Sequence, residues 1–274
     1  MIHLNEVNLL ERLTFAQKLI SECNKISKKI FVQGCNTFWK KDGTPVTNLD
    51  IDLEQFISKK IILSYPMDGC IGEELVDKDS RNGYTWTVDP IDGTRSFIYK
   101  VPLFSTMIGL LFEDEPILGI ISFPILNECI YAVKNLGAYW IPPFKKKSIK
   151  CKVKIQDIHK PLICCTDIKF FMGQYAGLLN LLQSRAKNIR TWGDSYGHML
   201  VVTGRAALMI DPAPSLKIYD IVPIKIIAEE AGAIFRYLDI GSNVRSATGA
   251  VTTIASNLDK LVVNHLNQCN LTQK

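Results

Sequence analysis

The chain has 274 residues, and its 32 basic and 27 acidic residues give a formal net charge of +5. This length allows one large domain or two closely joined halves, and so mild a charge gives no indication of the basic face expected of a nucleic-acid-binding protein. No segment approaches the roughly 18 consecutive apolar residues of a membrane span, and no cationic start followed by an apolar run suggests a secretory signal.

The cysteines and histidines argue against a zinc site. Eight cysteines are present without a C-x-x-C pair, and the four histidines form no H-x-x-x-H pair. Zinc sites in proteins are usually built from such nitrogen and sulfur ligands. We therefore expect reduced thiols, several of them buried, in a cytoplasmic protein.

The first third of the chain predicts two amphipathic helices. Apolar residues recur every three or four positions from Leu9 to Ile30, which indicates a long N-terminal helix. A second helix is expected to begin near Asp50 and to end before Pro66. The polar loop between them, 40–45, has two interpretations: its lysines are solvated, or Lys40 and the loop close over a metal site.

The middle of the chain predicts strands joined by short turns. Alternation over residues 84–88 indicates one strand, which should stop at Asp89-Pro90 because proline has no N–H group for the ladder. Further strands are expected at Thr106–Phe112, Ile117–Phe123, Glu128–Val133 and Ala138–Ile141, as an antiparallel meander. The basic run from Lys145 to Lys154 should form an exposed edge, where lysines discourage pairing between molecules.

The second half alternates between strand and helix, which predicts layers of helices and sheets. The expected strands are Leu162–Cys165, Asn188–Thr191, Ala207–Ile210, Ile234–Tyr237 and Val251–Ala255. The expected helices are Ile168–Ser184, Ser195–Thr203, Asp220–Ala231 and Leu258–Leu266.

The turn after the first predicted strand carries the strongest chemical signal. In Asp89-Pro90-Ile91-Asp92-Gly93-Thr94, two carboxylates flank the Ile91 carbonyl, Gly93 permits close approach of a ligand, and Thr94 can cap a helix. Hard oxygen ligands beside a helix N-terminus suit a divalent cation that holds a phosphate. The alternative is a plain turn, because Asp, Pro and Gly are common turn residues.

Further acids lie where a fold can bring them to this turn. They are Glu73 and Glu74 upstream, Asp220 at a predicted helix start, and Asp50, which by itself is also a plausible helix N-cap. The chain resembles the inositol monophosphatase family of metal-dependent phosphatases. The matching stretches are Thr47–Asp50, Gly72–Glu74, Asp89–Thr94, and Tyr219-Asp220 followed by Glu230–Gly232. Three further stretches, Trp192–His198, Thr203–Ala206 and Met209–Pro212, resemble its histidinol-phosphatase-like branch.

The resemblance implies an α/β fold, an α-β-α-β-α layered sandwich with an antiparallel sheet in the first half and a mixed sheet in the second. Residues 1–142 would contain the helix pair, the antiparallel sheet and most metal ligands. Residues 143–274 would contain the mixed half, the last metal ligand and the substrate rim. Lys100 departs from the family pattern, in which this position is often glycine.

The resemblance also implies a metal site and roles for its residues. One ion would take Glu73, Asp89 and the Ile91 carbonyl, and a second would take Asp89, Asp92 and Asp220. A third, weaker ion would sit near Glu73. All these ligands are oxygens, which favours Mg²⁺, with Mn²⁺ as the alternative, in two or three sites. Asp50 and Thr94 would orient and deprotonate the attacking water, with Glu74 assisting, and the N–H groups of Gly93 and Thr94 would hold the phosphate.

The substrate is expected to be a small phosphate monoester. The resemblance places Asp194, Arg205 and Asp211 at the substrate rim, where two carboxylates favour a cationic amino alcohol and hence histidinol phosphate. Inositol 1-phosphate is the alternative substrate, followed by a nucleotide 3′-phosphate and by a non-catalytic regulatory role. We expect a homodimer that is sensitive to Li⁺, with no nucleic-acid or membrane partner.

Overall fold

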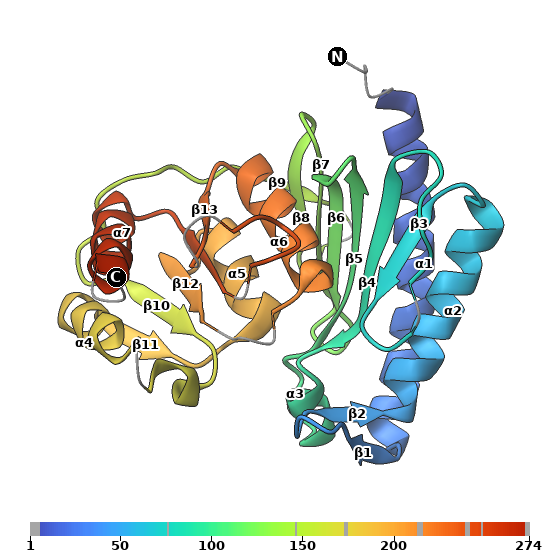
Figure 1. Cartoon of the computed structure of the whole chain (residues 1–274), viewed down its shortest axis with the longest axis horizontal. Coiled ribbons are helices and arrows are strands. Elements are labelled where there is room, and N and C mark those ends of the chain that lie inside the picture. Colours follow the sequence, from blue (N-terminus) through green and yellow to red (C-terminus); the bar gives the residue numbers. More distant parts are fainter. Residues whose placement is uncertain are drawn as a thin grey trace.

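The computed structural model describes residues 6–75, 77–145, 147–172, 175–212, 216–238, 242–247 and 249–271. Helices and sheets alternate in layers across the molecule (Figure 1). Helices α1 and α2 cover one face of a large sheet, α5 and α6 lie between this sheet and a smaller one, and α4 and α7 cover the outer face of the smaller sheet. The predicted α-β-α-β-α sandwich is confirmed.

The outer helix pair forms where the apolar periodicity predicts it. Helix α1 spans Glu6–Gln33 and α2 spans Asn48–Ser64, and their apolar faces are buried against the large sheet. A short hairpin between them, β1 (Thr37–Trp39) and β2 (Pro45–Thr47), was not expected. Because β2 runs directly into α2, the start of this helix is tied to the hairpin.

The large sheet has seven strands in the order β3-β4-β5-β6-β7-β8-β9. Their bounds are Gly69–Gly72, Tyr84–Asp92, Ser105–Phe112, Glu115–Phe123, Glu128–Val133, Gly137–Ile141 and Ile149–Cys151. The sheet is antiparallel from β4 to β9, as predicted, and β3 adds a parallel pairing with β4 that the pattern did not predict. Strand β9, within the basic run, is the expected edge.

The predicted end of β4 at Asp89-Pro90 is wrong. The strand continues to Asp92, and its pairing with β5 shifts register between Asp89 and Asp92. Proline is tolerated at such an irregularity because no ladder hydrogen bond is required there. The carbonyl of Pro90 accepts a hydrogen bond from Thr106 Oγ1 at 2.9 Å. Both carboxylates therefore lie on a bulged strand end rather than on a free turn.

A short helix, α3 (Thr94–Ile98), follows this bulge, with Gly93 as its N-cap at φ 81°. Just beyond it, Lys100 has φ 60°, a conformation that favours glycine. The Lys100 ammonium donates to the Phe31 carbonyl and lies 5.2 Å from the Phe31 ring. These contacts tie α1 to the segment that follows α3.

Two glycines allow α6 (Ile218–Ala231) to lie close on the large sheet. A Cβ at Gly109 of β5 would lie 2.5 Å from Val222 Cγ1, and one at Gly119 of β6 would lie 2.7 Å from Pro223 Cα. Larger residues at these positions would push the helix away. This packing brings the N-terminal turn of α6, which carries Asp220, to the carboxyl end of β4.

The smaller sheet has five strands in the order β11-β10-β12-β14-β13. Their bounds, in chain order from β10, are Leu162–Cys165, Asn188–Arg190, Leu208–Asp211, Ile234–Tyr237 and Ala250–Thr253. Strands β10, β11 and β12 are parallel and the other pairs are antiparallel, so this sheet is mixed as predicted. Helix α5 (Asp194–Val202) packs on its inner face.

The outer layer differs from the prediction at one helix. Residues 168–184 were expected to form one helix, but Ile168–Phe171 is a 3₁₀ turn (η1), Met172 has extended backbone, and α4 spans Ala176–Arg185. Positions 173 and 174 lie outside the described residues. Helix α7 spans Ser256–Leu271 and packs beside α4.

Within the described residues, no helix combines the length and apolar character needed to cross a bilayer. The described cysteine side chains are all free thiols, as the sequence predicts.

Candidate active site

A cleft of about 640 Å³ opens where β4, α3, α5 and α6 meet. Most of the predicted site residues line it: Glu73, Asp89, Ile91, Asp92, Gly93, Thr94, Asp194, Asp211 and Asp220. Asp50, Glu74 and Arg205 are not among its lining residues. The fold thus brings together acids that lie far apart in the sequence.

Three carboxylates form the centre of the cleft. Oxygens of Asp89, Asp92 and Asp220 all lie within 4.8 Å of one another. Burial, followed by repulsion from neighbouring acids, raises the pKa of Asp89 and of Asp220 well above the usual range, and burial also raises the pKa of Asp92. Such a cluster of hard oxygen ligands fits a divalent cation, which would offset the repulsion.

Each of these carboxylates has one oxygen held by the protein. Asp89 Oδ1 accepts from Ile91 N at 2.9 Å, and Asp220 Oδ2 accepts from Lys217 N at 2.7 Å. Asp92 Oδ2 accepts from Ser195 N at 3.0 Å and from both the Ser195 and Ser105 hydroxyls. These bonds fix the orientation of the acids before any ligand binds.

Ser195 was missed in the sequence because it belongs to α5, far along the chain from Asp92. The only available signal was its place directly after Asp194 at a predicted helix start, where a backbone N–H is exposed to an acceptor. The structure assigns that N–H to Asp92.

Glu73 lies at the edge of the cluster and is paired with a lysine. Lys40 Nζ lies 3.1 Å from Glu73 Oε1 and 2.6 Å from Glu74 Oε1. Burial raises the pKa of Glu73 to about 7, although Lys40 opposes this shift. For Lys40 itself, burial lowers the pKa, but hydrogen bonding to Glu74 and attraction to Glu73 outweigh it, so the net direction is upward. Of the two interpretations of the 40–45 loop, the structure supports closure over the acidic site.

Asp50 lies behind Thr94, at the first turn of α2. Its Oδ2 accepts from the backbone N of Thr47 at 2.9 Å and from the Thr47 hydroxyl. The N-cap of α2 is therefore Thr47, and Asp50 is the N3 residue of a capping box instead of the N-cap itself. Its Oδ1 lies 3.4 Å from Thr94 Oγ1, which is also 3.0 Å from the Ile91 carbonyl oxygen. Burial, opposed by the Thr47 bonds, raises the pKa of Asp50 to about 6. A carboxylate with this pKa can accept a proton near neutral pH.

Two of the three predicted rim residues face the cleft. Asp194 begins α5 with φ 55°, a strained conformation for an aspartate, and its Oδ2 would lie 3.2 Å from a Cβ at Gly93. Burial, followed by repulsion from Asp92 and Asp211, raises the pKa of Asp194 well above the usual range. Asp211 ends β12 and is also buried.

The structure does not bring Arg205 to this cleft. Its Nη2 pairs with Glu128 Oε2 at 2.9 Å, and its guanidinium lies 4.7 Å from the centre of the Trp140 ring. Because Glu128 is buried on β7, Arg205 ties the turn after α5 to the large sheet.

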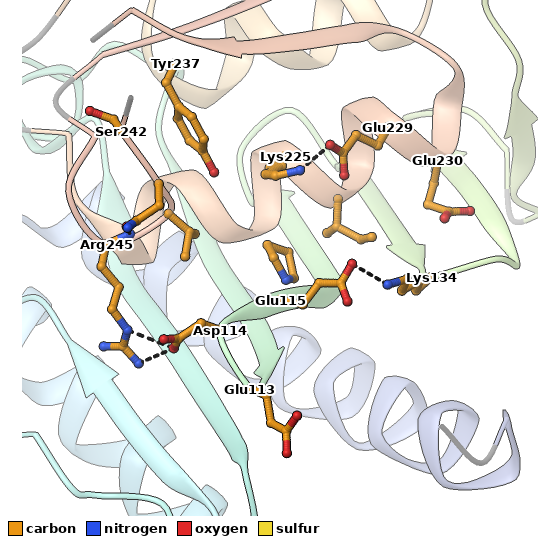
Figure 2. A pocket seen from close by; sticks show the side chains of 14 residues that line it. Glu113, Asp114, Glu115, Lys134, Lys225, Glu229, Glu230, Tyr237, Ser242 and Arg245 are labelled. Carbon is orange, nitrogen blue, oxygen red and sulfur yellow. Dashed lines mark hydrogen bonds and ion pairs between the residues drawn. The ribbon is translucent and has the colours of Figure 1, made fainter. Parts of the chain in front are cut away.

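A second cavity, of about 430 Å³, lies away from the acidic cluster, between α6, the β5–β6 turn and the 242–245 segment (Figure 2). Its charged groups are largely paired with one another: Arg245 with Asp114 at 2.6 Å, Lys225 with Glu229, and Lys134 with Glu115. These pairs join charges of opposite sign, which offset one another, whereas the carboxylates at the centre of the cleft repel one another. We therefore assign the candidate site to the cleft.

The comparisons with known proteins agree with this assignment. The model of the inositol monophosphatase family matches residues 8–271. A histidinol-phosphatase of Chlorobaculum parvum is 36% identical over 222 residues, which cover 80% of this chain and 83% of that protein.

Solved structures show the same fold. The extragenic suppressor protein suhB of Bartonella henselae gives a TM-score of 0.82 at 19% identity and covers 93% of this chain and 98% of its own. An inositol monophosphatase of Zymomonas mobilis gives a TM-score of 0.77 at 26% identity, covering 94% and 98%. The chain belongs to the inositol monophosphatase family and is a phosphatase.

Proposed function

We propose that this phosphatase is Mg²⁺-dependent and acts on histidinol phosphate. The observation that carries the proposal is the convergence of Asp89, Asp92 and Asp220 within 4.8 Å at the floor of a cleft. At this separation and an effective dielectric of about 20, each ionised pair would cost about 3 kcal/mol. Bound cations would remove that cost.

The donor set supports Mg²⁺ over softer metals. Glu73, Asp89 and the Ile91 carbonyl would hold one ion, and Asp89, Asp92 and Asp220 a second, so every protein ligand is an oxygen. When bound, such ions would supply an activated water and stabilise the leaving oxygen of a phosphate monoester.

The chain's own residues would handle the proton of that water. Thr94 lines the cleft while Asp50 lies behind it, 3.4 Å away, so Thr94 would orient the water and pass a proton toward Asp50 Oδ1. Thr47 holds the other oxygen of Asp50, which keeps Oδ1 turned toward Thr94. Glu74, paired with Lys40, would assist from behind Glu73. The backbone of Gly93 and Thr94, at the cleft wall, would hold the phosphate.

The rim supports a cationic leaving group. Asp194 and Asp211 line the cleft, and burial, followed by the charges of Asp92 and Asp211, raises the pKa of Asp194. A positively charged amino alcohol would relieve this repulsion, whereas a neutral inositol would not. The histidinol-phosphatase of Chlorobaculum parvum points in the same direction.

Phosphate release from a panel of substrates tests the proposal. Histidinol phosphate, inositol 1-phosphate and adenosine 3′,5′-bisphosphate would be compared with Mg²⁺, after EDTA treatment and after restoring Mg²⁺. We expect the highest kcat/KM for histidinol phosphate, loss of activity with EDTA and full recovery with excess Mg²⁺. Full turnover in metal-free buffer would refute the metal requirement, and a preference for inositol 1-phosphate would refute the substrate.

A further inference from the structure

Glu54 is a fully buried carboxylate that no motif in the sequence singled out. It lies on α2, exposes 0% of its surface and accepts three consecutive backbone N–H groups. Oε2 accepts from Glu73 N at 3.0 Å and from Glu74 N at 2.8 Å, and Oε1 accepts from Leu75 N at 2.9 Å. Its charge is thus offset by the backbone of the segment that carries two site acids.

The neighbouring glycine makes room for this arrangement. A Cβ at Gly72 would lie 1.9 Å from Glu54 Oε1 and 2.4 Å from Glu54 Cδ. No side chain fits at that distance, so the backbone can wrap over the carboxylate only because position 72 is glycine. Glu54 and Gly72 therefore form one complementary unit.

The position of this segment matters for the cation site. Glu73 is not part of the group of three acids within 4.8 Å, so its contribution depends on where the backbone of 73–75 holds it. Asp50 lies one turn before Glu54 on the same helix, and it reaches Thr94. Helix α2 thus places Asp50 beside Thr94 and, through Glu54, holds the segment that carries Glu73.

We infer that Glu54 is a positioning residue, whose carboxylate fixes the backbone of residues 73–75 so that Glu73 faces the cleft ready for a cation. This inference rests on the proposed function, because it assumes that Glu73 is a metal ligand. Groups that orient metal ligands in this way commonly contribute ten-fold or more to metal affinity.

Glu54→Gln is the direct test. Glutamine keeps the shape and one acceptor oxygen, but its NH₂ group would face a backbone N–H and cannot accept from it. The matched control is Glu230→Gln. The Glu230 carboxylate also accepts two backbone N–H groups, from Asn135 and Gly137 at 2.8 Å each, but it lies at the second cavity (Figure 2).

Mg²⁺ affinity would be measured by isothermal titration calorimetry on each purified protein. We expect Glu54→Gln to weaken Mg²⁺ binding by on the order of ten-fold and Glu230→Gln to leave it unchanged. At excess Mg²⁺ the kcat of Glu54→Gln should recover, with the substrate KM unaltered. A purely structural role would lower thermal stability in both variants without this difference in metal affinity.

Gly72→Ala gives an independent test if Glu54→Gln fails to fold. It retains the carboxylate but forces the segment away from it, so it should weaken Mg²⁺ binding in the same way. Folded variants that bind Mg²⁺ as tightly as the wild type would overturn the inference and leave the proposed function intact. A wild type that binds no Mg²⁺ would instead overturn the proposed function, and this inference with it.

Discussion

Replacing Glu73 with glutamine should stabilise the metal-free protein and yet reduce the stabilisation that Mg²⁺ provides. Burial raises the pKa of Glu73 from its ordinary 4.5 to about 7, with Lys40 opposing the shift. Between pH 4.5 and about pH 7, Glu73 is ionised in the unfolded chain but still protonated in the folded protein. The free energy of unfolding therefore falls as the pH rises through this range. Above about pH 7, ionised Glu73 lowers the stability of the metal-free folded protein by about 3 kcal/mol in total.

The effect of Mg²⁺ has the opposite sign. At a concentration 100 times its dissociation constant, an ion that binds only the folded protein adds about 2.7 kcal/mol. The wild type should gain this in full, because Glu73 is then neutralised by the ion. Glu73→Gln should gain less, because its side chain no longer carries the charge. The variant should therefore be the more stable protein in EDTA and lose that advantage in Mg²⁺.

Urea denaturation between about pH 5 and pH 8, with EDTA and with Mg²⁺, measures both effects. Glu230→Gln serves as the control, since its change in stability should be the same with and without Mg²⁺. Two results would refute the reasoning. One is a Glu73→Gln variant that follows the wild type at every pH in EDTA, and the other is equal stabilisation of both proteins by Mg²⁺.

Two other predictions separate the roles of the site residues. Asp220→Asn should raise the Mg²⁺ concentration needed for half-maximal activity, whereas Thr94→Ala should lower kcat by about a hundred-fold with the Mg²⁺ requirement near that of the wild type. Equal changes of the two Mg²⁺ titrations would contradict these roles. Asp194→Asn should lower kcat/KM for histidinol phosphate by about ten-fold or more, while hydrolysis of a simple aryl phosphate stays nearly unchanged. An equal loss on both substrates would mean that Asp194 does not recognise the leaving group.

The hydrophobic periodicity of the sequence correctly predicted the helices and strands whose formation depends mainly on neighbouring residues. The alternation over residues 84–88 correctly predicted a strand, but Thr87 is as fully buried as Trp86 and Val88, because both faces of β4 are covered. The prediction of α1 is also correct, since its buried Leu9, Leu13 and Ala16 keep helical spacing. The acids of the site were found because Asp89 and Asp92 share one short motif, and because the resemblance assigned Asp220, at a predicted helix start, to the same metal site.

The remaining features depend on contacts between distant segments. The parallel pairing of β3 with β4 has no local signature, and the bulge at Pro90 became visible only through the pairing with β5. Glu54 lies between Leu53 and Gln55 on α2, and its hydrogen-bond partners come from the distant 73–75 segment. The resemblance placed Arg205 at the substrate rim, but motif order along the chain does not reveal that its ion-pair partner is Glu128 on the large sheet.

The close packing of α6 against Gly109 and Gly119 has a consequence for the order of events in folding. Asp220 reaches Asp89 and Asp92 only after this helix has docked, and docking closes a very long loop of chain. Before that step Asp220 is apart from Asp89 and Asp92, so the three acids do not offer a cation a common site. An ion that needs all three would therefore act late. Its binding would lengthen the lifetime of the folded molecule by slowing unfolding, and it would leave the folding rate nearly unchanged.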